Sequence, residues 1–302
     1  MTVEILKQKK TRWPFMFVTD KDGTRTQWVV LHAPIQSQSR MDMYSEYRQQ
    51  GLRFIGMTSF MTFPADQNTA SLDYHSICEA WAHCFREPSN YLPENRPQVL
   101  LPFSDFIDPL SISRHQFQQT STKSEAYDFL YLGSNEPWKM KAKNWELALK
   151  CLPLLCNELG LRGAVVGIDP QMLPECDDLT IKPWLSYQQF LQLLSNCRFL
   201  FAPNSLDASP RVLAEALCLD VPIIANRSLI GGWHYINRHS GMFFHDEHDI
   251  CTTAQHCLNS QFQPRAFFIN QFGPQRSGKA LLSLIQQLEP DICAKGPLRL
   301  SY

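Results

Sequence analysis

The hydrophobic pattern of the chain from residue 127 onward is regular, with short apolar runs that alternate with amphipathic segments of helical length. The apolar runs, each expected to form a strand, are 129–132, 164–168, 198–202, 222–225 and 242–244. The segments expected to form helices are 144–159, 187–196, 211–219 and 249–258. Continuous apolar strands separated by helices are typical of a parallel sheet covered on both faces. This part of the sequence therefore predicts a doubly wound parallel α/β domain.

The first third of the chain has a different pattern. Runs that favour strands lie at 13–19, 24–31, 52–57 and 99–101. The first two flank Asp20-Lys21-Asp22-Gly23, whose residue types favour a hairpin turn. Residues 76–85 have apolar positions at helical spacing, so we expect a helix there.

A polar stretch at 111–125, rich in Gln, Ser and Thr, separates the two patterns and is expected to be a linker. It divides the chain into an N-terminal domain, 1–120, and a C-terminal domain, 121–302. A length of 302 residues suits two domains of ordinary size. One more amphipathic helix is expected at 277–288, and it can pack either on the C-terminal domain or back on the N-terminal domain.

Composition and charge exclude several classes of protein. With 44% hydrophobic and 19% charged residues the chain can form a core, unlike a disordered segment. Its net charge of -1 lacks the basic excess of a dedicated nucleic-acid binder. No apolar run reaches the roughly 20 residues of a membrane-spanning helix, 13–18 is too short for a signal-peptide core, and the ten cysteines form no C-x-x-C pair. We expect a cytoplasmic globular enzyme with reduced cysteines and no membrane-spanning segment.

The segment 203–217 carries the strongest local signal for chemistry. An apolar strand ends in a polar loop, and Pro210 then opens a helix with Ser209 as its cap. The free amides of such a helix start suit a phosphate, and Arg211 can add a charge-assisted hydrogen bond. Glu215, about one turn further on, can accept two vicinal hydroxyls of a ribose. The alternative is an ordinary capped helix with a surface glutamate.

The same segment resembles the donor-site signature of retaining glycosyltransferases of the GT-B fold, especially the family 4 group. The matching residues, in order, are Asp207, Glu215, Ala216, Leu217, Pro222, Ile223, Ile224 and Ala225. Downstream, Gly231-Gly232 and the segment 236–244 resemble the family's Gly-Gly…Gly segment. Upstream, Tyr131-Leu132-Gly133 and Lys139 resemble its strand, glycine and phosphate-binding lysine. The resemblance covers 127–244.

The resemblance implies two Rossmann-like domains, of which the N-terminal one is reduced, and a role for each matching residue. Glu215 would bind the nucleotide ribose, Asp207 the hydroxyls of the donor sugar, and Lys139 the diphosphate. The donor-binding set it implies is Gly133, Ser134, Asn135, Lys139, Ser209, Pro210, Arg211, Glu215, Gly231 and Gly232. Ser134 stands where the family usually has a basic residue, and Ala208-Ser209-Pro210 where it has Gly-Phe-Gly. We expect Arg211, or Lys141 and Lys143, to supply the missing charge.

The function that the resemblance implies is glycosyl transfer from a UDP- or GDP-linked sugar to a glycan or other hydroxyl acceptor, with retention. Negative charge builds on the leaving diphosphate, and Lys, Arg and helix amides can stabilise it without a metal. No cofactor besides the donor is expected. A sugar-nucleotide epimerase on the same fold and a non-catalytic sugar- or nucleotide-binding module are the alternatives.

Other polar clusters have a simpler interpretation. Asp20-Lys21-Asp22 has the D-x-D form of a manganese site, but Gly23 favours a turn. His245-Asp246-Glu247-His248 is expected to be a solvated, capped loop rather than a metal site. His32 and Asp105 follow strands of the first domain and are the acceptor-side candidates, with a turn or satisfied polar group as the alternative. The tryptophans expected to be packing residues are Trp138, Trp145, Trp184 and Trp233.

Overall fold

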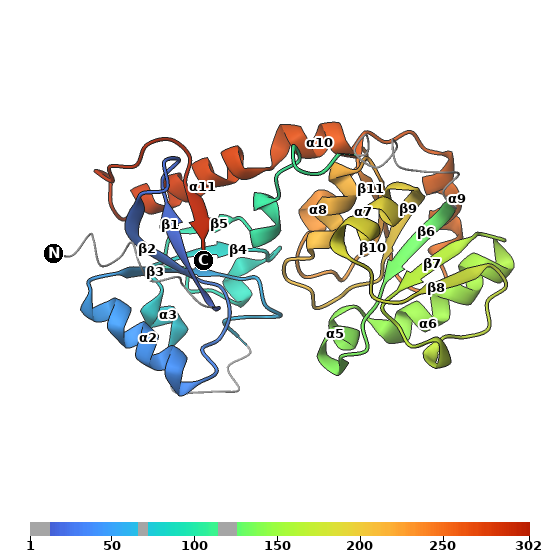
Figure 1. The fold of residues 1–302 in the computed structure, drawn as a ribbon, viewed down its shortest axis with the longest axis horizontal. Coiled ribbons are helices and arrows are strands. Elements are labelled where there is room, and N and C mark those ends of the chain that lie inside the picture. The colour runs from blue at the N-terminus through green and yellow to red at the C-terminus, as the bar shows by residue number, and fades with distance from the viewer. Residues whose placement is uncertain (1–12, 66–71, 114–125) are drawn as a thin grey trace. The chain divides into compact units, whose positions relative to one another are not determined.

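A computed structural model describes residues 13–65, 72–113 and 126–302 of the chain. It divides the chain into two compact units, each with its own six-stranded sheet (Figure 1). Unit 1 extends to Phe106 and also contains Phe272–Tyr302, and unit 2 is Ile107–Gln271. The C-terminal segment from 272 therefore belongs with unit 1, whereas the sequence pattern had grouped all of 121–302 as one domain. Most of the predicted linker, 114–125, lies outside the described residues.

Unit 2 is built on a parallel sheet with the strand order β11-β10-β9-β6-β7-β8. Its strands are β6 (Tyr127–Leu132), β7 (Gly163–Val166), β8 (Leu179–Lys182), β9 (Cys197–Ala202), β10 (Ile223–Asn226) and β11 (Gly241–Phe244). Its helices are α5 (Pro137–Ala142), α6 (Trp145–Pro153), α7 (Tyr187–Ser195), α8 (Arg211–Cys218), α9 (Ile250–Asn259) and α10 (Pro264–Gln271). The predicted doubly wound sheet is confirmed.

The core of unit 2 follows from the continuous apolar runs of its inner strands. Phe129 and Phe199 stack on neighbouring strands at 5.8 Å, and both are fully buried. The predicted helix at 144–159 forms as α6 followed by a π-helical turn, Leu154–Glu158. The strand β8 was missed because it lies at the sheet edge and its four residues are only half-buried, so it has no apolar run.

Unit 1 has the strand order β12-β1-β2-β3-β4-β5. Its strands are β1 (Phe15–Thr19), β2 (Arg25–Leu31), β3 (Arg53–Met57), β4 (Ala80–His83), β5 (Gln98–Leu100) and β12 (Arg299–Ser301), and its helices are α2 (Gln38–Gln49), α3 (Tyr74–Ile77) and α11 (Pro274–Gln286). β2 to β5 are parallel, while β1 is antiparallel to both neighbours. No helix in the described ranges of either unit is both long and apolar enough to cross a membrane.

The predicted turn between the first two strands is confirmed. The carboxylate of Asp20 accepts hydrogen bonds from the backbone amides of Asp22 and Thr24, each over 2.9 Å. Gly23 has φ of 83°, a left-handed conformation that glycine adopts without strain. The D-x-D motif thus forms a turn whose first carboxylate is occupied by backbone amides.

The predicted helix at 76–85 is wrong. The helix α3 ends at Ile77, and Ala80–His83 form the strand β4 between β3 and β5. All four residues of β4 are buried, because both faces of this strand are covered. A short apolar run that is buried on both faces has no alternation, so its spacing cannot distinguish a strand from a helix.

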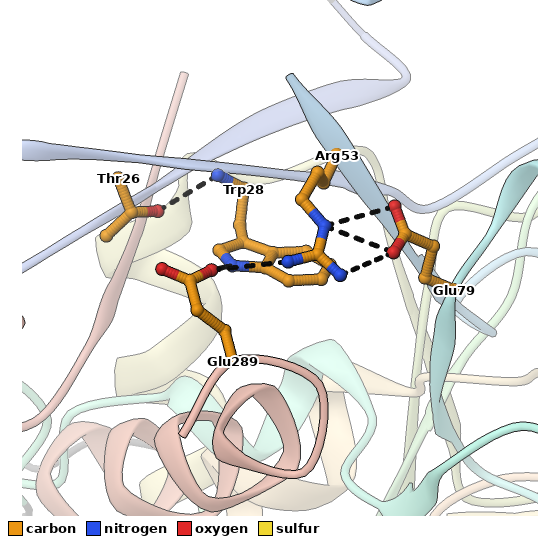
Figure 2. Close-up of polar contacts among 5 residues, drawn as sticks. All are labelled: Thr26, Trp28, Arg53, Glu79 and Glu289. Carbon is orange, nitrogen blue, oxygen red and sulfur yellow. Dashed lines mark hydrogen bonds and ion pairs between the residues drawn. The ribbon is translucent and has the colours of Figure 1, made fainter. Parts of the chain in front are cut away.

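The C-terminal segment completes unit 1. Leu281, Leu284 and Ile285 of α11 are buried in the same apolar cluster as Trp28 and Ile55 of the sheet. Just after α11, Glu289 accepts a hydrogen bond from the Trp28 indole over 2.9 Å and lies 3.4 Å from Nη1 of Arg53 (Figure 2). This contact links the returning segment to strands β2 and β3.

The Arg53 guanidinium lies at the centre of this cluster (Figure 2). It lies 4.1 Å from the centre of the Trp28 ring and makes a bidentate contact with Glu79. The hydrogen bond to Glu79 raises the pKa of Arg53. The donors of the guanidinium match the two oxygens of a carboxylate. Without the guanidinium, the partly buried carboxylates of Glu79 and Glu289 lose their shared cationic partner.

We expect Arg53→Met to lower the free energy of unfolding by about 1–2 kcal/mol, because two charge-assisted contacts are lost in a partly exposed setting. Urea denaturation of the full chain measures this change. The matched control is Arg276→Met, which removes an exposed arginine of α11, and its effect should stay within about 0.5 kcal/mol. Equal effects of the two substitutions would contradict the role given to Arg53.

Candidate functional site

A cavity of about 530 Å³ lies within unit 2 at the carboxyl ends of its strands. Leu132 and Val166 line it from the ends of β6 and β7, and the loop before α8 lines it from the side. In open α/β sheets this edge is where ligands bind, because the loops and helix starts meet there. The cavity brings together five residues that the sequence predicted for one site: Asp207, Ser209, Pro210, Arg211 and Glu215.

Glu215 is the least exposed of the charged residues that line the cavity, with only 5% of its surface exposed. Every residue of α8 after Arg211 is buried, so the glutamate lies inside a helix that packs on the sheet. Tyr187 donates its hydroxyl to Oε1 of Glu215 over 3.0 Å, and Nη2 of Arg211 lies 3.7 Å from the same oxygen. Burial raises the pKa of Glu215, while Arg211, Tyr187 and Lys143 oppose that rise.

Asp207 and Lys143 line the same cavity with opposite charges. Asn204 donates a hydrogen bond to Oδ2 of Asp207 over 3.1 Å, and the backbone amide of Ser209 also contacts this carboxylate. Burial raises the pKa of Asp207 and lowers the pKa of Lys143. The charge of Asp207 raises the pKa of Lys143, and the charge of Lys143 lowers the pKa of Asp207. The attraction between the two groups therefore partly compensates for their loss of water.

The lysine in the cavity is Lys143 and not Lys139, which the sequence motif had indicated. Lys139 forms an ion pair with Glu136 on the short helix α5 and does not line the cavity. Lys141 is exposed and lines a separate cavity of unit 2. Lys143 ends α5, and Asn144, with φ of 51°, then turns the chain into α6. The sequence had offered Arg211, or Lys141 and Lys143, as the source of the missing charge, and of these Arg211 and Lys143 line the cavity.

The Gly133-Ser134-Asn135 segment does not line the cavity but fixes the loop that follows β6. A Cβ atom at Gly133 would lie 2.2 Å from the Ile168 side chain, so only glycine fits. Ser134 accepts a hydrogen bond from the backbone of Glu136, and Asn135 accepts one from the backbone of Asp169. These residues hold the loops after β6 and β7 together.

Gly231 and Gly232 pack against the loop that carries Asp207 and are not part of the cavity wall. A Cβ atom at Gly231 would lie 1.9 Å from the carbonyl oxygen of Ala208, and the Gly231 amide donates to the Asp207 carbonyl over 3.2 Å. Gly232 has φ of 78° and approaches Pro210. The paired glycines therefore allow the closest approach of two backbones next to Asp207.

The helix α8 begins at Arg211, where the sequence predicted a helix start, but its cap differs from the prediction. Pro210 is its N-cap, in place of Ser209, and it provides no side-chain cap. Among the described residues, the backbone amides of Arg211 and Val212 have no hydrogen-bond acceptor. The free amides and the positive end of the helix dipole lie beside the cavity and favour a bound anion.

The aromatic side of the cavity was not predicted. Trp184 and Tyr187 line it and are 60% and 50% exposed, so the expectation that Trp184 is a packing residue is wrong. Trp138 is also exposed, whereas Trp145 is buried and stacks with Tyr131, as expected of a packing residue. Trp184 lies two residues after β8. Because the sequence did not predict this strand, it did not indicate that Trp184 lies at the carboxyl ends of the strands.

The predicted loop interpretation of His245-Asp246-Glu247-His248 is supported by its contacts. The backbone amide of His245 donates to both carboxylate oxygens of Asp249 over 3.0 Å, and Glu247 forms an ion pair with Lys150. Within the parts of the chain that the structure describes, no three His, Cys, Asp or Glu side chains gather as a metal-binding group.

The two acceptor-side candidates, His32 and Asp105, belong to unit 1 and are both buried. Nδ1 of His32 lies 3.2 Å from the Ser59 hydroxyl, and Nε2 lies 3.4 Å from the Tyr302 hydroxyl. Its ring stacks on Phe103, and burial lowers the pKa of His32 to about 4. His32 is therefore neutral at pH 7.

Comparison with models of known protein families and with curated proteins finds no match. Solved structures are similar to this chain in fold. A glycosyltransferase from Rickettsia africae matches it with a TM-score of 0.60 and 14% identity, over 87% of this chain and 77% of that one. HepE from Anabaena, in complex with UDP-glucose, matches with a TM-score of 0.57 and 11% identity, over 86% of this chain and 78% of that one. TarM matches with a TM-score of 0.56 and 10% identity over 82% of this chain, which spans only 52% of the length of TarM.

At these identities the likeness establishes the fold. The chain has the GT-B fold, with two Rossmann-like α/β units, as the sequence predicted. One fold hosts many activities, so the fold alone does not determine the chemistry of the cavity.

Burial of neutral His32 makes the stability of the protein depend on pH. The unfolded chain binds a proton near pH 6.5 and the folded chain only near pH 4, so the free energy of unfolding decreases as the pH falls between these values. From pH 7.5 to 5.0 we expect wild type to lose about 2 kcal/mol more than His32→Gln does, because one pKa unit corresponds to about 1.4 kcal/mol. Urea denaturation at the two pH values measures this difference, and parallel losses would contradict the prediction.

Proposed function

We propose that the protein is a glycosyltransferase that takes a sugar from a nucleoside-diphosphate sugar bound in the cavity of unit 2. The observation that carries the proposal is the gathering of Lys143, Arg211 and the free amides of α8 beside two buried carboxylates, Asp207 and Glu215. Cations and helix amides suit a diphosphate, and carboxylates suit sugar hydroxyls. A cavity of about 530 Å³ has the size of ordinary small-molecule sites.

In the proposed pose, each part of the donor lies against the groups of the cavity that suit its charge or its hydrogen bonds. The diphosphate lies against Lys143 and the start of α8, with Arg211 at the rim. The ribose hydroxyls donate to Glu215, and the hydroxyls of the transferred sugar donate to Asp207. Trp184 and Leu185 then form the wall beside the nucleobase. Lys143 thereby takes the role that the motif alone had given to Lys139.

The reaction breaks the bond between the anomeric carbon and the diphosphate, and negative charge builds on the leaving oxygen. Lys143, Arg211 and the amides of Arg211 and Val212 are cationic or partly positive groups that can stabilise this charge. We propose that transfer is metal-independent for this reason and that it retains configuration, as in the family 4 enzymes that the sequence resembles. The acceptor is a glycan or another hydroxyl compound, and His32 and Asp105 remain candidates on unit 1.

UDP-glucose is the first donor to test, because the structure of HepE contains it. The purified chain would be incubated with UDP-glucose, UDP-N-acetylglucosamine, GDP-mannose or GDP-glucose, with a mixture of sugar acceptors, and with or without EDTA. Release of UDP or GDP that requires an acceptor and persists in EDTA supports the proposal. Isomerisation of the donor sugar without acceptor would instead indicate an epimerase. Binding of a nucleotide without turnover of any donor would indicate a binding module.

The two lysines of the α5 region provide a matched pair of substitutions. We expect Lys143→Ala to weaken UDP or GDP binding about 10- to 100-fold, because a hydrogen bond to a charged group contributes about 1.5–3 kcal/mol. Lys139→Ala removes the same charge from the same helix but outside the cavity, and it should change the affinity less than about threefold. Isothermal titration calorimetry measures both. A larger loss in Lys139→Ala would restore the interpretation given by the motif.

A further inference from the structure

The two oxygens of the Glu215 carboxylate have different surroundings. Oε1 accepts the hydroxyl of Tyr187 over 3.0 Å and faces the Arg211 guanidinium at 3.7 Å. Within the described part of the chain, Oε2 receives no hydrogen bond. Glu215 is 5% exposed and lines the cavity, and its Oε2 is not among the fully enclosed atoms that lack a partner, so a ligand in the cavity can reach this oxygen. A carboxylate oxygen is an acceptor only, so the cavity favours a ligand that donates a hydrogen bond there.

Tyr187 is held at this position by the start of its helix. It is the first residue of α7, directly after Ser186, which forms a capping box with Gln189. Half of the Tyr187 surface is exposed, so burial in a core does not determine where the side chain points. Burial of the hydroxyl beside Glu215 raises the pKa of Tyr187 to about 12, so the hydroxyl remains a donor at neutral pH.

The hydroxyl of Tyr187 competes with Arg211 for the carboxylate. Arg211 lies one helical turn before Glu215 and its side chain is largely exposed, so it can move. Without the tyrosine hydroxyl, the carboxylate can rotate to form a bidentate pair with the guanidinium, in which both oxygens are occupied. Tyr187 therefore keeps one oxygen fixed and leaves the other available to the cavity.

We propose that Tyr187 is a positioning residue that makes the cavity selective for ribonucleotides, by fixing Glu215 so that Oε2 accepts a hydroxyl of the ribose. This inference rests on the proposed function, because it requires a nucleoside diphosphate in the cavity. A ribose carries two vicinal hydroxyls that can donate to a carboxylate, and a dideoxyribose carries none. A site built to accept such a donor discriminates against an analogue that lacks it, because the bound analogue removes water from the carboxylate oxygen without replacing the hydrogen bond.

The test compares the affinities of UDP and 2′,3′-dideoxy-UDP, and of GDP and 2′,3′-dideoxy-GDP, for wild type and Tyr187→Phe. Calorimetry of the full chain gives each dissociation constant. In wild type we expect the ribonucleotide to bind about 10- to 100-fold more tightly than its dideoxy analogue. In Tyr187→Phe the affinity for the ribonucleotide should fall about tenfold and the affinity for the analogue by less than about twofold, so the selectivity should fall about five- to tenfold.

Two control variants separate this role from a simple change in the cavity wall. Trp184→Leu removes an aromatic ring from the same cavity. It should lower the affinities for a ribonucleotide and for its analogue by the same factor, without changing the selectivity. Tyr91→Phe removes a hydroxyl from unit 1 that makes no hydrogen bond among the described residues, and it should change neither affinity.

The possible failures are distinguishable. If Tyr187→Phe lowers the affinities for a ribonucleotide and its analogue by the same factor, or changes neither, the selectivity is unchanged. The inference about Tyr187 is then overturned, while nucleotide binding by the cavity stands. If wild type binds both members of a pair with equal affinity, Glu215 does not hold the ribose and the inference is again overturned. If wild type binds none of the four nucleotides, the proposed function and the inference fail together.

Discussion

The burial of one carboxylate, that of Glu215, is the constraint on which the candidate site depends. A charged group that lies inside a helix packed on the sheet is costly unless other groups compensate it. Tyr187 and Arg211 contact it, and Lys143 contributes opposite charge from across the cavity. The end of α5 and the start of α7, which are distant from α8 in the sequence, must therefore lie near the first turns of α8.

Close backbone contacts make this arrangement possible. The Ala142 carbonyl accepts the amides of both Ser205 and Leu206, which joins the end of α5 to the loop that carries Asp207. On the other side of that loop, Gly231 approaches Ala208 more closely than a residue with a side chain could. These backbone contacts hold the loop that carries Asp207 beside the end of α5, so Asp207 and Lys143 line the same cavity.

Unit 1 is stabilised by different means and carries no recognisable motif. Its sheet depends on the C-terminal segment, in which α11 supplies core residues and Glu289 contacts Trp28 and Arg53 (Figure 2). The buried, neutral His32 lies at the end of β2, with an apolar ring above it and hydroxyls at both nitrogens. The GT-B likeness covers both units, and the cavity lined by Lys143, Asp207, Arg211 and Glu215 lies in unit 2.

Local sequence patterns predict the parallel sheet of unit 2, the first hairpin of unit 1 and a site that contains Asp207, Arg211 and Glu215. These follow from local patterns, because a buried parallel strand must be apolar along its length and a proline after a polar loop marks the start of a helix. Three other features could not be predicted from local patterns: Ala80–His83 form a strand, residues 272–302 belong to unit 1, and Lys143 and Tyr187 line the cavity. Each of these depends on contacts between segments far apart in the chain, and the spacing of residues along one segment contains no information about which distant segment will pack against it.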